Sequence, residues 1–175
     1  MKKVWFLGLG LSLALVGCSD SGSDEANKEE ATNATEENTD VAGELMDFYL
    51  NVTTTVNGVD IDLNGYEAAM AGDEPPAGEE LAKLKESAAA SATAAAEAVE
   101  GMEIPEGLGD QKEAVESFKS TLTESYNMKA EALTQEGEAD FTAADEKLNE
   151  AENQIKAILD DAGLVSSSLI SDLNG

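Results

Sequence analysis

Apolar side chains recur every three or four residues along four long blocks of this sequence, and proline or glycine separates the blocks. This spacing places the apolar side chains on one face of a helix. The last block is the most regular, with Phe141, Ala144, Leu148, Ala151, Ile155, Ile158 and Ala162. We therefore predict four helices, at about 41–71, 78–102, 108–136 and 140–162.

Short connections between these helices make sequence neighbours antiparallel. The predicted fold class is therefore all-α, with an up-down-up-down four-helix bundle over residues 41–163. Residues 164–175 follow the last block and include Leu169, Ile170 and Leu173, so they are expected to form a C-terminal tail or a short helix.

One stretch of the first block, Val56 to Met70, contains a pattern that is typical of a calcium loop. Asp60, Asp62 and Asn64 stand at the first, third and fifth positions of an EF-hand-like sequence. Such a loop needs a bidentate carboxylate at its twelfth position, where this chain has Ala71. The three polar residues are therefore only weak metal candidates.

The same stretch also allows a β-hairpin. Asn57-Gly58 is a favoured two-residue turn, and residues on both sides of it are β-branched. The apolar spacing nevertheless keeps its phase from Leu45 to Met70, which favours one continuous helix. We expect residues 52–63 to be helical, and a hairpin or an irregular break remains the alternative.

The start of the chain has the features of a secretion signal. Met1-Lys2-Lys3 is basic, and the apolar run from Val4 to Val16 is too short to span a bilayer as a helix. The run ends at Leu15-Val16-Gly17-Cys18, which resembles the lipobox of bacterial lipoproteins. The resemblance implies that residues 1–17 are a lipoprotein signal peptide that is cleaved between Gly17 and Cys18. It also implies that Cys18 then carries a diacylglycerol and an N-acyl chain such as palmitate.

Residues 18–40 separate this predicted anchor from the helical blocks. From Ser19 onward the segment holds eight acidic residues and one lysine, and it has no Leu, Ile, Val, Met or aromatic side chain. A segment of this kind cannot bury enough apolar surface to offset the entropy lost on ordering. We therefore expect a lipidated cysteine followed by a disordered acidic tether.

The composition excludes several classes of function. The formal net charge is −27, so nucleic acid is not an expected partner, because its binding requires phosphate neutralisation. The chain has no histidine, which is the commonest general base, and its one cysteine is the predicted lipid attachment point. No phosphate-binding loop, nucleophile motif or zinc spacing is present. We expect a protein that is not an enzyme and has no cofactor.

The body also resembles small, mostly uncharacterised helical lipoproteins of low-GC Gram-positive bacteria. The resemblance rests on residues 64–67 (NGYE), 104–106 (IPE), 129–133 (KAEAL) and 144–148 (ADEKL), and on Phe118 and Phe141. It implies location and fold only.

We expect a membrane-anchored, extracytoplasmic lipoprotein that acts as a non-catalytic interaction or structural module of the cell envelope. Its partner would be an envelope protein with a basic face. The alternative is a lipoprotein that binds a small ligand or a cation such as calcium. The expected location is the cell membrane, or the outer membrane if the host has two membranes.

Overall fold

A computed structural model describes the backbone of residues 29–165 and 167–174, and the side chains within those ranges from Val41 onward. The predicted signal peptide, its cleavage site and the lipidation site at Cys18 lie outside the described residues. The helices are α1 (Glu29–Asn57), α2 (Ile61–Met70), α3 (Glu79–Glu100), the 3₁₀ helix η1 (Glu106–Gln111), α4 (Lys112–Thr134), α5 (Thr142–Asp161) and α6 (Leu169–Leu173).

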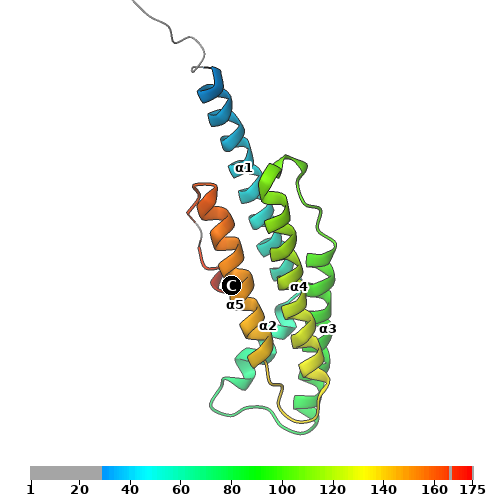
Figure 1. The fold of residues 1–175 in the computed structure, drawn as a ribbon. Coiled ribbons are helices and arrows are strands. Elements are labelled where there is room, and N and C mark those ends of the chain that lie inside the picture. Colours follow the sequence, from blue (N-terminus) through cyan, green and yellow to red (C-terminus); the bar gives the residue numbers. More distant parts are fainter. Residues whose placement is uncertain (1–28, 166, 175) are drawn as a thin grey trace, which may run out of the picture.

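The described part of the chain is all-helical, which confirms the all-α part of the predicted fold class. Figure 1 shows α3, α4 and α5 side by side with alternating directions, and α1 alongside them. The most extensive packing joins α4 to α3 and to α5, while α2 packs on α3. The alanines of α3 let it approach its neighbours closely, and the fully buried ones are Ala88, Ala92 and Ala95.

The prediction of one unbroken helix over 41–71 is wrong at residues 58–60. Gly58 and Val59 form a turn, and Asp60 precedes α2. The backbone N–H groups of Val59 and Asp60 both donate to the carbonyl of Val56, at 2.9 and 3.0 Å, which closes α1. The apolar spacing could not reveal this break, because Val56 and Leu63 are buried on either side of it.

The hairpin alternative is also wrong, since residues 52–57 and 61–63 are helical and no strand occurs in the described ranges. A lone hairpin is marginally stable without further strands to pair with. The Asn57-Gly58 pair here ends a helix.

The predicted tether needs a second correction. Residues 29–40 form the first part of α1, which begins at Glu29, and Figure 1 shows that end of α1 projecting beyond the other helices. This segment contains neither proline nor glycine, and four of its twelve residues are glutamate, which favours helices. Its acidic start also suits the positive end of the helix dipole. Low hydrophobicity alone therefore did not predict its backbone conformation.

Candidate functional site at the α1–α2 break

The break between α1 and α2 is fixed to α3 by one buried serine. The hydroxyl of Ser91 donates to the carbonyl of Val59 at 2.7 Å and accepts from the N–H of Leu63 at 3.3 Å. These two groups belong to the turn and to the first turn of α2, where a helix leaves its backbone groups without internal partners. A single side chain of α3 therefore satisfies the backbone on both sides of the break. Ser91 could not be singled out from the sequence, because it is one of several small polar residues in an alanine-rich segment.

The three weak metal candidates do not form one ligand set. The Asp60 side chain is buried, with 2% of the residue exposed, and it bonds to the side chain of Asn64. Asp62 is exposed. The structure thus brings Asp60 and Asn64 together without Asp62. In the part of the chain that the structure describes, no three His, Cys, Asp or Glu side chains are grouped to hold a metal ion.

Burial raises the pKa of the Asp60 carboxyl, because a charge is less stable away from water. The bond from Asn64 and the nearby Lys129 act in the opposite direction, while Glu67 adds to the rise. Burial also raises the pKa of the Tyr126 hydroxyl, and the charges of Asp60 and Glu67 raise it further. Tyr126 therefore stays a neutral phenol at physiological pH.

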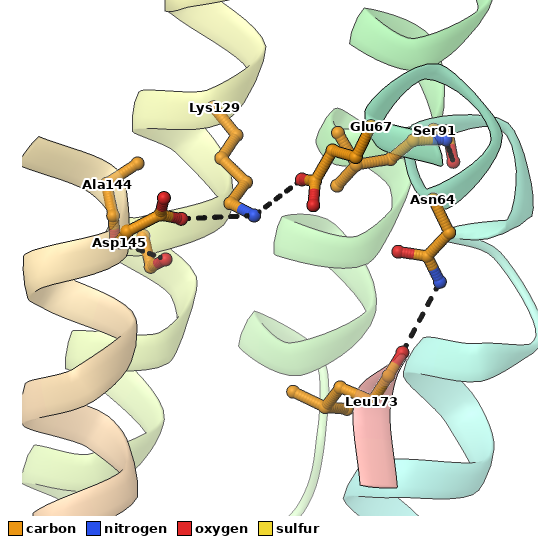
Figure 2. Close-up of polar contacts among 9 residues, drawn as sticks. Asn64, Glu67, Ser91, Lys129, Ala144, Asp145 and Leu173 are labelled. Carbon is orange, nitrogen blue, oxygen red and sulfur yellow. Dashed lines mark hydrogen bonds and ion pairs between the residues drawn. The ribbon is translucent and has the colours of Figure 1, made fainter. Parts of the chain in front are cut away.

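A buried lysine lies at the centre of the site. The ammonium of Lys129 on α4 is 2.6 Å from a carboxylate oxygen of Glu67 on α2 and 3.3 Å from one of Asp145 on α5. Figure 2 shows this lysine between the two acids, which approach it from opposite sides. Only 6% of Lys129 is exposed. Lys129 lies at helical spacing from Tyr126 and Leu133, but no spacing pattern shows that its charge links three helices.

One aromatic ring lies next to this lysine, and a second ring packs against the first. The ammonium of Lys129 lies 5.1 Å from the centroid of the Phe141 ring, a distance typical of a cation–π contact. Phe141 meets Tyr66 edge to face, with 6.0 Å between the ring centroids. The hydroxyl of Tyr66 accepts the N–H of Ala139 at 3.2 Å, which fastens the loop before α5.

Beside these rings is a surface hollow of about 260 Å³ that is lined by the acids Glu67, Glu138 and Asp145. Lys129 already pairs with two of these acids. The arrangement therefore joins α2, α4 and α5 through an internal cation.

The end of the chain also reaches this region. The side-chain amides of Asn57 and Asn64 donate to the carbonyls of Asp172 and Leu173, at 2.8 and 3.3 Å. Figure 2 shows the bond from Asn64 to the last turn of α6. The two asparagines stand on either side of the break, so the break positions both donors for the C-terminal helix.

No protein-family model matches this chain, and no curated protein or solved structure is significantly similar to it. None of the helices in the described ranges combines the length and apolar character needed to cross a membrane.

Proposed function

We propose that this chain is a membrane-anchored extracytoplasmic lipoprotein whose helical body is a non-catalytic interaction or structural module of the cell envelope. The observation that carries the proposal is Leu15-Val16-Gly17-Cys18, placed directly after a basic start and an apolar run. Two or three acyl chains, at roughly 0.8 kcal/mol for each buried CH₂, would hold even a strongly acidic chain at a membrane.

The proposed body is an up-down-up-down four-helix bundle in which α1 and α2 together form the first leg. Residues 18–28 separate the proposed anchor from the first residue of α1. The part of α1 before residue 41 adds a helical spacer of roughly 18 Å at 1.5 Å per residue. This helical part would add to the separation between the bundle and the membrane.

Three lysines are bonded to groups of the same chain, which supports a partner with a basic face. Lys85 donates to the carbonyls of Gln135 and Gly137, at 2.5 and 2.6 Å, and Lys119 donates to the carbonyl of Met102 at 2.7 Å. Lys129 is buried between carboxylates. These cations are directed into the chain, while acidic residues dominate its outer faces. Such a surface attracts basic partners and repels acidic ones.

The anchor is tested by growing cells with labelled palmitate and comparing the wild type with Cys18→Ala. We expect the label to disappear in the variant and the protein to leave the membrane fraction. Ser19→Ala is the matched control, since it alters the neighbouring residue and should keep the label. Undiminished label in Cys18→Ala would contradict the proposal.

The interaction role is tested by crosslinking in intact cells. We expect the wild type to capture a defined envelope protein with a basic face, and the yield to fall as salt is raised, because salt screens exposed charges. Capture that is unaffected by salt would argue against a charge-based partner.

A second candidate function is the binding of a small ligand. A surface hollow of about 510 Å³ lies between the start of α3 and the end of α4, and Leu81, Ala89 and Leu133 contribute apolar surface to it. This volume is typical of small-molecule sites. A thermal-shift screen of metabolites and metal ions with the wild type and Ala89→Phe, which would fill the hollow, separates the two functions. A compound that stabilises only the wild type supports ligand binding, and no response to any compound argues against it.

A further inference from the structure

The last helix, α6, lies between α1 and α5 and packs against both. Figure 1 shows it next to α5, at the C-terminal end of the chain. Its two leucines point into the body, with 0% of Leu169 and 2% of Leu173 exposed. α6 therefore completes the apolar core along the seam between these two longer helices.

Polar bonds hold α6 to the first leg of the bundle. The hydroxyl of Tyr49 on α1 donates to the carboxylate of Asp172, which also accepts the hydroxyl of Ser167. The amides of Asn57 and Asn64 satisfy the carbonyls at the end of α6, as described above. These bonds fix both the side chain and the backbone of the last turn.

A single carboxylate holds the start of α6 to α5. Glu152 accepts a hydrogen bond from the hydroxyl of Ser168 and another from the N–H of Ile170, each at 3.2 Å. The segment thus has partners on α1, α2 and α5, in addition to internal bonds such as that from the N–H of Ser171 to the hydroxyl of Ser168.

These contacts decide whether α6 is folded. A helix of five residues is far too short to persist alone in water, so α6 depends on the seam for its structure. The connection before it contains Val165, which is 92% exposed and makes little contact with the body. A helix of only five residues with an exposed connection can open at a lower free energy than the whole domain.

We propose that residues 167–174 are a C-terminal latch, which can leave the seam between α1 and α5 as a unit while the rest of the body stays folded. The opened seam is then a groove shaped for one occupant, the latch itself. Leu169 and Leu173 are the apolar anchors, and Asn57, Asn64, Tyr49 and Glu152 are the polar groups that recognise it. The latch would control whether a molecule from outside the chain can reach the seam.

The first test is hydrogen exchange of the full-length chain in detergent micelles. We expect the peptide that covers residues 164–175 to exchange at least tenfold faster than the core of α4, because it opens locally. Asn57→Ala should raise the exchange rate of that peptide by about fivefold, the effect of one lost hydrogen bond, and leave the exchange rate of α4 unchanged. Thr54→Ala on the exposed face of α1 should change neither. Exchange of residues 164–175 in step with α4 would overturn the latch.

The second test uses a chain that ends at Leu164 and a synthetic peptide of residues 165–175. We expect the shortened chain to remain helical and to bind this peptide. Replacing both Leu169 and Leu173 by serine in the peptide should abolish binding, while Val165→Ser should leave it unchanged. A shortened chain that does not fold, or that folds but ignores the peptide, would contradict the proposal, because the latch must separate from a folded body and fit its groove.

Discussion

The ammonium of Lys129 on α4 lies 2.6 Å from the carboxylate of Glu67 on α2, although the two residues are 62 positions apart in the sequence. Asp145 on α5 approaches the same ammonium at 3.3 Å, so one lysine connects three helices. The side chain of Lys129 is almost fully buried, while Glu67 and Asp145 remain partly in contact with water. The two acids therefore stabilise the buried cation while keeping part of their own hydration.

Lys129→Ala should lower the free energy of unfolding by about 2–3 kcal/mol, because it removes a buried stem as well as the charge. Lys129→Met should be milder, since it keeps most of the stem. Lys147→Ala is the matched control on an exposed ion pair and should have little effect. Chemical denaturation followed by circular dichroism measures all three. Equal losses in Lys129→Ala and Lys147→Ala would show that the buried cation has no special role.

Asp60→Asn should change how stability depends on pH. Burial raises the folded pKa of Asp60 above its ordinary value of 3.8, so the folded state keeps a proton that the unfolded state has lost. The Asp60 contribution to stability is therefore fully present below pH 3.8 and is lost as the pH rises through the folded pKa. An asparagine side chain cannot ionise, so the variant should be more stable relative to the wild type at pH 7 than at pH 3.

Thermal melts across this pH range provide the measurement, and Asp62→Asn is the control. Asp62 is exposed and two residues away, so its variant should follow the wild-type curve. If Asp60→Asn and Asp62→Asn gave the same pH profile, the burial of Asp60 would have no energetic consequence.

Tyr49→Phe should protect the chain against alkaline pH. Burial and the bond to Asp172 raise the pKa of the Tyr49 hydroxyl from 10.0 to about 12. Between these values the folded state binds more protons than the unfolded state, so wild-type stability falls as the pH rises. Phenylalanine cannot ionise, and although the variant loses a hydrogen bond at pH 8, its melting temperature should fall less between pH 9 and pH 11. Parallel curves for wild type and variant would contradict the assignment.

Gly65→Ala should stabilise the protein by about 0.5–1 kcal/mol, because alanine is the better residue inside a helix. Gly65 lies within α2, and an added Cβ would meet no atom within 4 Å. Gly137→Ala is the matched opposite case, since Gly137 has a φ of 84°. That conformation is unfavourable for alanine, so the variant should lose about 1 kcal/mol. If the denaturation midpoints of the two variants moved in the same direction, the result would contradict the backbone conformations of these glycines.

The sequence predicted the regular helices well, because their signal is local. The spacing of apolar residues placed α3 and α5 within about two residues of their observed ends. The break in the first block was only an alternative to the continuous helix, because an isolated glycine such as Gly58 weakens a helical pattern without ending it. What fixes the break is the bond of Val59 to Ser91 on another helix, and such a contact leaves no spacing pattern.

The polar contacts of the site were harder to predict, because the partner residues lie on other helices. Lys129 lies in the apolar row of α4, but its partners come from two other helices. Asn64 was singled out for its position in a calcium pattern, and its amide instead bonds to the end of α6. In both cases the residue was noticed, and its partner became visible only when the helices were packed.

The proposed lipid anchor at Cys18 is tested most directly by mass spectrometry of the N-terminus of the protein, isolated from its native membrane. We expect the first peptide to begin at Cys18 and to carry the added mass of a diacylglycerol, with or without an N-acyl chain. A first peptide that begins at Met1, or an unmodified Cys18 within a longer peptide, would contradict the proposed anchor.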